Sequence, residues 1–200
     1  MLRFILRLTA AGLLLMVGVG CTASQLRAMQ QAAVPYSISP KFDLSRPWTI
    51  AVLPPTQTRP ASDVEDAGMF AALVDHAGLQ LMKVVTFTVV DRSEVSRVLQ
   101  EQQFGTSGVV DPATAARLGK LLGASAVMTI RIGKLKHDPF WSDSPNQRDA
   151  EVGVRIISVE TGEVLYSAQG QGSSFEGAAE ALANAVDGAL LPLLEKGGSE

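Results

Sequence analysis

The chain has only one cysteine and two histidines among its 200 residues. One thiol cannot close an internal disulfide or form a cysteine-only metal site, and two histidines cannot build a multi-histidine metal cluster. Basic residues are also scarce, since 17 lysines and arginines stand against 20 aspartates and glutamates, for a net charge of −3. This balance disfavours broad electrostatic binding to DNA or RNA. The sequence thus predicts no metal site and no nucleic-acid partner.

The chain also lacks the motifs that carry catalysis or nucleotide binding. It has no Gly-x-Ser-x-Gly elbow, and neither His76 nor His137 stands at a spacing that completes a catalytic triad. The glycine-bearing stretches 105–108 and 170–172 do not follow a strand and open a helix, as a phosphate-binding loop must. We therefore expect a non-enzymatic protein without a cofactor.

Residues 1–20 have the pattern of a secretory signal peptide. Two arginines precede an apolar stretch at residues 8–19, which is shorter than the roughly 20 residues that a membrane-spanning helix needs. Small residues follow, and Gly20 stands immediately before the single cysteine, Cys21. This arrangement resembles the bacterial lipoprotein pattern, in which cleavage between these two residues leaves a diacylated N-terminal cysteine. The alternative is an ordinary signal peptide or membrane anchor in which Cys21 has no role.

The lipoprotein pattern implies a location and a lipid partner. Thr22 stands where lipoproteins retained in the inner membrane often carry aspartate, so the resemblance favours the outer membrane, with the domain in the periplasm. Membrane lipid would contact the protein through acylated Cys21, since two acyl chains give stable anchoring where one does not. Loss of residues 1–20, whose only charged residues are two arginines, lowers the basic count from 17 to 15 and takes the net charge from −3 to −5.

The remaining chain divides into a tether, a domain and a tail. Residues 21–47 are polar and contain three prolines, which predicts a lipidated tether that gives reach without much packing. Apolar residues make up 46% of the chain and charged residues 18%, the composition of a folded domain and not of a disordered one. We place that domain at residues 48–194 and a frayed tail at residues 195–200.

Apolar periodicity predicts five strands and four helices within the domain. Alternating or β-branched runs indicate the strands, and apolar residues at helical spacing mark the helices. The order β-α-β-α-α-β-β-β-α predicts an α+β fold, a two-layer mixed sheet with helices packed mainly on one face. The expected strands cover 48–53, 86–90, 124–135, 151–159 and 164–172, and the expected helices run over 63–82, from Asp91 to about Phe104, from Asp111 to Gly123, and over 178–191.

Four stretches of the domain resemble the CsgG family, which includes the curli secretion channel and smaller lipoproteins with the same periplasmic core. They are IAVLPP, VVDRSEVSRVLQEQ, AARLGKLLGASAVMTIRIG and VRIISVETGEVLYSAQGQG. The likeness runs from about Trp48 to Leu194 and implies a CsgG-like periplasmic domain. In the channel, two hairpins leave this core and pair between subunits to form a membrane barrel. Here residues 137–148 and 173–176 are too short to supply such hairpins.

Two surface features are candidate partner-binding sites. Phe140 and Trp141 form an isolated aromatic pair in a polar loop, and exposed aromatic residues are enriched at contact sites. The alternative is that this pair packs over the edge of the sheet. Arg131 and Arg155 belong to a polar set in phase on three adjacent strands, for which a merely solvated face is the alternative. The whole set is Thr129, Arg131, Arg155, Ser167, Gln169 and Gln171.

The resemblance implies a membrane-anchored periplasmic lipoprotein that acts in cell-envelope assembly or export as a binding or scaffold component. Its partner would be a protein of the cell envelope. The alternative is a lipoprotein that activates a penicillin-binding protein in peptidoglycan synthesis, because the same core resembles those activators. A subunit of an outer-membrane secretion pore is a third reading, against which the missing hairpins argue. Whether the chain forms a homo-oligomer stays open.

We predict that the mature protein begins at Cys21 and carries acyl chains there. Intact-mass analysis of the purified protein should give the mass of residues 21–200 plus lipid. A Cys21→Ser variant should lose the lipid mass and leave the membrane fraction. Recovery of an unlipidated mature form that begins at another residue would contradict the prediction.

Overall fold

The computed structural model describes residues 35–57, 67–102, 111–137, 141 and 146–198. Residues 34–200 form one compact unit, and the described ranges make up most of it. Gly20, Cys21 and Phe140 lie outside the described residues, so the predictions made for them remain predictions. Within the described ranges, no helix has both the length and the apolar character needed to cross a membrane.

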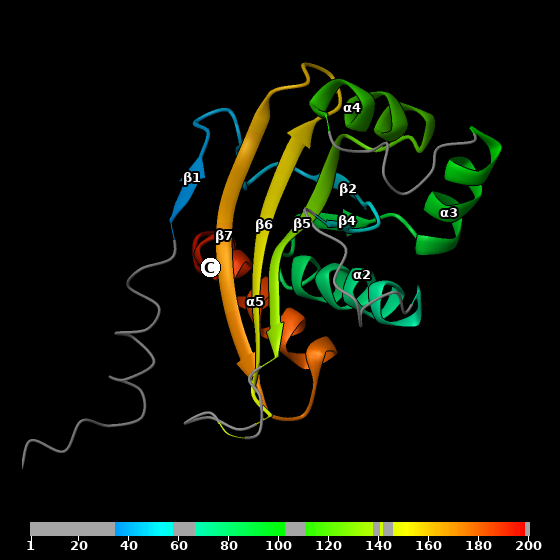
Figure 1. The fold of residues 1–200 in the computed structure, drawn as a ribbon. Helices are drawn as coiled ribbons and strands as arrows, with labels where there is room; N and C mark the ends of the chain where they lie inside the picture. Colours follow the sequence, from blue (N-terminus) through cyan, green and yellow to red (C-terminus); the bar gives the residue numbers. More distant parts are fainter. Residues whose placement is uncertain (1–34, 58–66, 103–110, 138–140, 142–145, 199–200) are drawn as a thin grey trace, which may run out of the picture. The chain divides into compact units, whose positions relative to one another are not determined.

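The described strands form a single mixed sheet (Figure 1). Its order is β1-β7-β6-β5-β2-β4, and β3 pairs with β5 beside this path. The pairs β1–β7, β7–β6 and β6–β5 are antiparallel, whereas β2 runs parallel to both β4 and β5. The predicted α+β class with a mixed sheet is confirmed. The strands are β1 (Tyr36–Ile38), β2 (Trp48–Val52), β3 (Thr56–Gln57), β4 (Phe87–Val89), β5 (Ala126–His137), β6 (Arg148–Ser158) and β7 (Val164–Ser174).

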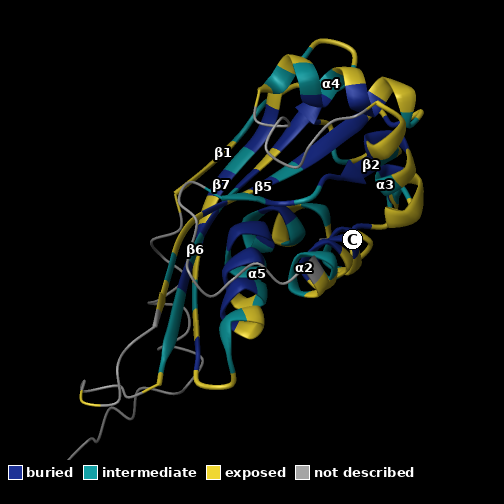
Figure 2. Cartoon of the chain, turned by 45° about the vertical axis from the view of Figure 1, so that its right-hand side comes forward, coloured by how far each residue is buried: buried dark blue, intermediate teal, exposed yellow. Residues whose placement is uncertain are grey.

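The described helices lie on both faces of this sheet. They are α2 (Ala67–Leu81), α3 (Arg92–Glu101), α4 (Pro112–Leu121) and α5 (Ala178–Gly197). The two longer helices, α2 and α5, pack over Ile50 and Met128, while α3 and α4 pack over Ala51 and Val127 on the other side (Figure 2). Neighbouring strand residues point to opposite faces, so β2 and the start of β5 are apolar on both. The sequence predicted a layer of helices mainly on one face, which corresponds to α2 and α5. The structure adds a smaller layer, α3 and α4, on the other face.

Helix ends follow the capping residues that the sequence offers. Asp91 accepts hydrogen bonds from the hydroxyl and the backbone N–H of Ser93 before α3, and Asp111 accepts one of 2.9 Å from the N–H of Thr114 in α4. These bonds lower the pKa of both carboxyl groups, because they favour the charged form. Gly123, just beyond α4, has a φ of 64°, a left-handed conformation that glycine adopts at little cost.

Helix α5 lies against β7 backbone to backbone. A β-carbon on Gly170 would lie 1.8 Å from the carbonyl oxygen of Ala185, and one on Gly172 would lie 2.3 Å from that of Ala181. Neither position can hold a side chain unless the helix moves. The buried Tyr166 hydroxyl adds a 2.6 Å hydrogen bond to the carbonyl oxygen of Ala189, and burial raises the pKa of Tyr166. The glycine-bearing stretch at 170–172 thus serves close packing of α5.

The prediction that residues 21–47 form a tether is wrong for their second half. Strand β1 pairs with residues 166–168 of β7, at the edge of the sheet. Phe42 is only 4% exposed and packs on Trp48 and Phe87, with ring centroids 5.1 and 5.9 Å away. The prolines interrupt the apolar periodicity on which a sequence reading depends, but they do not prevent one aromatic side chain from entering the core.

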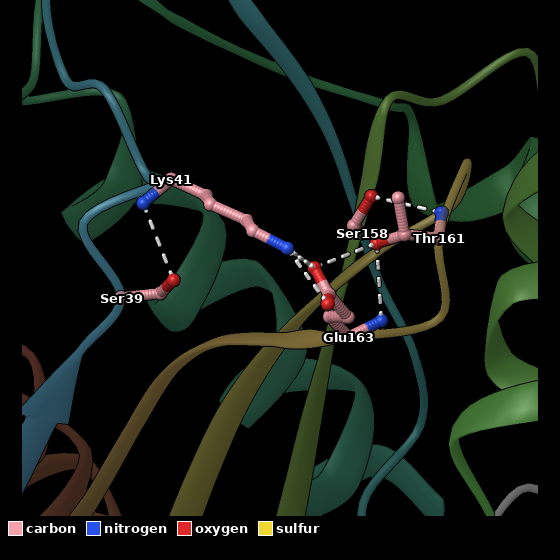
Figure 3. Close-up of polar contacts among 5 residues, drawn as sticks. All are labelled: Ser39, Lys41, Ser158, Thr161 and Glu163. Atoms are coloured by element: carbon pink, nitrogen blue, oxygen red, sulfur yellow. Dashed lines mark hydrogen bonds and ion pairs between the residues drawn. The ribbon is translucent and has the colours of Figure 1, made fainter.

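An ion pair fastens this segment to the β6–β7 turn (Figure 3). The Lys41 ammonium donates to both carboxylate oxygens of Glu163, at 2.8 and 2.7 Å. The bond from Lys41 lowers the pKa of the Glu163 carboxyl. The pair therefore contributes at neutral pH, and its contribution is lost as the pH falls through that lowered pKa. Both side chains are well exposed, so the contribution is small.

We expect Gly170→Ala to destabilise the fold by about 3 kcal/mol, since its methyl group would meet the backbone of α5. The matched control is Gly188→Ala, within α5, where a β-carbon would lie 3.6 Å from the nearest atom of another element, an ordinary contact. That change should stabilise the protein by about 0.5–1 kcal/mol, because alanine favours the helix over glycine. Urea unfolding measures both, and equal effects of the two changes would contradict the close packing.

A second prediction concerns Phe42. Phe42→Ala should lower the free energy of unfolding by about 3 kcal/mol, as expected for removal of a buried aromatic ring. Lys41→Ala, at the adjacent residue, should cost at most about 1 kcal/mol because it breaks an exposed ion pair. Thermal unfolding of the two variants decides the point. If Phe42→Ala unfolds like the unaltered chain, residues 35–47 do not belong to the folded domain.

Candidate functional site

The sheet face opposite α2 and α5 carries polar side chains on its three long strands. Two neighbouring rows across β5, β6 and β7 are Thr129–Arg155–Ser167 and Arg131–Gly153–Gln169. Side chains of paired residues project from the same side of a sheet, so these rows share one surface. We call this surface, formed by the outward side chains of residues 129–136, 149–155 and 167–171, the open face. It contains both arginines that the sequence proposed, and the structure brings them together.

A β-bulge sets which residues of β5 reach the open face. The register shifts between Ile132 and Lys134, so that Gly133 is the extra residue. Beyond the bulge, Lys134 pairs with Glu151, and Leu135 packs against the apolar core. Without the extra residue, the two side chains would exchange faces and a lysine would enter the core. The bulge therefore adds Lys134 to the open face, together with Lys136, which pairs with Asp149.

A hollow of about 250 Å³ lies on the open face, around Arg131, Gly153 and Gln169. Its floor lies at Gly153, which has no side chain and separates Arg131 from Gln169 in the register. Arg131 and Arg155 are diagonal neighbours on adjacent strands, a relation that places residues about 7–8 Å apart. The hydroxyl groups of Thr56, Thr129 and Ser167 and the amide of Gln169 complete its polar lining, in which Glu151 is the one acidic residue described.

The chemistry of this hollow is that of anion recognition. Guanidinium groups donate paired hydrogen bonds to carboxylates and phosphates, and hydroxyl and amide groups add further donors. No described residues form a cluster of three or more histidine, cysteine or acidic side chains that could hold a metal ion. The open face is therefore suited to binding. Its hollow is smaller than the roughly 300–1,000 Å³ of ordinary small-molecule pockets, which favours a segment lying across the strands.

The aromatic candidate lies elsewhere. Trp141 is 76% exposed and follows the last pair of the β5–β6 ladder, His137 with Arg148. His137 is six positions after Arg131 on β5, a distance of about 20 Å along a strand. Trp141 therefore follows the end of the ladder that is remote from the arginines. The structure adds Phe175, 69% exposed just after β7, which the sequence analysis missed because a single phenylalanine between polar residues carries no periodic signal.

His76 has a structural role that the sequence did not show. Its Nε2 lies 2.6 Å from Asp187 Oδ1, a contact that joins α2 to α5. Its side chain is 31% exposed. On the same helix, Asp75 accepts a 2.9 Å hydrogen bond from Arg92 at the start of α3. These contacts hold helices together and do not form a reactive site.

A second hollow, of about 600 Å³, lies near the β6–β7 turn. Its lining includes Arg46, Trp48 and Lys120 as well as the Lys41–Glu163 ion pair. In this hollow three cationic side chains, Lys41, Arg46 and Lys120, stand against Glu160 and Glu163. The open face presents four cationic side chains on the adjacent strands β5 and β6, against Asp149 and Glu151. We therefore take the open face as the candidate functional site.

The fold and the open face define an α+β domain with one covered and one partly uncovered sheet face. The family model described as "Curli production assembly/transport component CsgG" matches residues 24–138, more than half of the chain. The chain therefore belongs to the CsgG family, as its four motif stretches predicted. No curated protein sequence matches it significantly.

Solved structures share its fold at low sequence identity. The PelC dodecamer from Paraburkholderia phytofirmans is 14% identical, with a TM-score of 0.53 over 80% of this chain and 96% of that chain. A point variant of the PelC dodecamer from the same organism is 15% identical, with a TM-score of 0.52 over 80% and 97%. The LpoB C-terminal domain from Salmonella enterica is 16% identical, with a TM-score of 0.42 over 63% and 82%. The PelC structures establish a shared fold.

Proposed function

We propose that this protein is a non-enzymatic lipoprotein of the outer membrane, whose periplasmic domain acts as a binding or scaffold component in cell-envelope assembly or export. The open face carries this proposal, because α2 and α5 pack over the opposite face, whereas Arg131, Arg155 and Gln169 are exposed. Membership of the CsgG family supports a role in assembly or transport. Docking of an envelope protein is the activity that such a surface supports.

The proposed lipid anchor fits this role. Cys21 is fourteen residues before Pro35, where the described domain begins. A chain of that length spans at most about 50 Å when fully extended. The open face would therefore remain within that reach, plus the size of the domain, of the membrane surface. Such tethering raises the effective concentration of the domain toward partners in the same membrane.

The identity of the partner separates the remaining alternatives. A second copy of this chain would make the protein a homo-oligomer, a reading that the likeness to the dodecameric PelC structures supports. A cell-wall synthase would make it a regulator of peptidoglycan synthesis. If the partner is a component of an export system, the protein acts in secretion. All three share docking through the open face.

We predict that a photo-crosslinking amino acid at Gln169, on the open face, will capture a protein partner in the living cell envelope. The same amino acid at Lys83, which is exposed just after α2 on the other side of the sheet, is the matched control and should capture no partner. The mass and sequence of the adduct identify the partner as a second copy, a synthase or an export component. Adducts from Lys83 alone, or none from Gln169, would overturn docking through the open face.

A further inference from the structure

We propose that the open face recognises an acidic protein segment and that Arg131 and Arg155 contact its carboxylate side chains. This inference rests on the proposed function, since it names the chemistry of the partner that docks there. It commits to a peptide with spaced aspartates or glutamates, lying in extended form across β5, β6 and β7.

The first argument is a local reversal of charge. Residues 21–200 carry a net charge of −5, yet the open face presents four cationic side chains. They are Arg131, Lys134, Lys136 and Arg155, and the acidic residues on the same surface are Asp149 and Glu151. A basic patch on an acidic protein steers acidic partners toward itself and repels them elsewhere. Charge complementarity therefore selects an acidic segment over a neutral one.

The second argument is the distribution of charge within the patch. Lys134 stands opposite Glu151 in the strand register, so a cationic and an acidic residue are neighbours there. Arg155 stands between Thr129 and Ser167 in the register, and both of these are neutral hydrogen-bonding residues. Arg131 is the diagonal neighbour of Arg155. A carboxylate between the two guanidinium groups could accept hydrogen bonds from both.

The third argument is the shape of the hollow. Gly153 leaves room above the sheet between Arg131 and Gln169, since a β-carbon built there would come no nearer than 4.0 Å to another residue. The space suits one acidic side chain reaching down from a segment above. A peptide with carboxylates at alternate positions places them about 7 Å apart on one side. This spacing matches the roughly 7–8 Å between the diagonal neighbours Arg131 and Arg155.

The experiment measures peptide binding by calorimetry, using residues 21–200 with Cys21→Ser. The probes are a blocked octapeptide of alternating glutamate and serine, its twin of alternating glutamine and serine, and inorganic phosphate. We expect the glutamate peptide to bind, with an affinity that falls at least about fivefold in Arg155→Gln, because a charge-assisted hydrogen bond is lost. Arg131→Gln should act in the same direction. Affinity should also fall as the salt concentration rises.

Two further variants separate a local site from net charge. Glu151→Gln should tighten binding of the glutamate peptide by about two- to threefold, since it removes a like charge from the hollow. Arg97→Gln, on α3, changes the net charge by the same amount as Arg155→Gln and breaks only exposed ion pairs. It should change affinity by less than about twofold. Urea unfolding confirms that each variant is folded before its binding is read.

The other outcomes contradict either the acidic chemistry of the partner or the proposed docking function. If the glutamine peptide binds as tightly as the glutamate peptide, the open face does not recognise carboxylate groups. If phosphate binds as tightly as the glutamate peptide, the ligand is one that carries phosphate. If Arg97→Gln and Arg155→Gln lower the affinity for the glutamate peptide equally, the net charge of the protein accounts for binding and there is no local site. If acidic peptides fail to bind while crosslinks from Gln169 persist, docking survives and its acidic chemistry is wrong. If peptides bind as expected while crosslinks from Gln169 are absent, the proposed docking function is wrong instead.

Discussion

The contact of α5 with β7 is the constraint on which the arrangement of the domain depends. At Gly170 and Gly172 the helix backbone touches the strand backbone, so α5 lies directly on β7. Most apolar residues of β5, β6 and β7 belong to the core on that side, whereas Val127 and Ile157 pack in the smaller core under α3 and α4. Strand alternation then sends the remaining polar side chains to the other face. Close packing on one side of the sheet thus creates the polar surface on the other.

The bulge at Gly133 keeps this division intact over the full length of β5. Twelve residues of regular strand would carry the sequence pattern out of phase, because Ile132 and Leu135 are separated by an odd number of positions yet both pack against the core. The additional residue restores the phase and places a lysine on the outer surface. Polar and apolar residues therefore stay on separate faces where β5 and β6 extend beyond α3 and α4. The basic character of the open face is a consequence of that register.

Local signals predicted most of the fold, and contacts between distant residues account for what they missed. Asp91, Asp111 and Gly123 act through neighbours a few residues away, so the sequence reveals them directly. The contact of Phe42 with Phe87, by contrast, depends on how the sheet brings remote segments together. The hydrogen bond between His76 and Asp187 joins residues 111 positions apart. Arg131 and Arg155 were found because strand alternation is itself a local rule, whereas their pairing register became known only from the sheet.

The packing of residues 35–47 changes the mechanics of the proposed anchor. A free tether from Cys21 to Trp48 could extend about 90 Å, whereas one that ends at Pro35 extends about 50 Å. Strand β1 also fixes the exit of the tether at the edge of β7, and Ser37 continues the row that contains Ser167 and Arg155. The segment that precedes β1 therefore enters the domain next to β7, one of the three strands of the open face. In the proposed arrangement, the start of the tether and the docking surface are neighbours on the sheet.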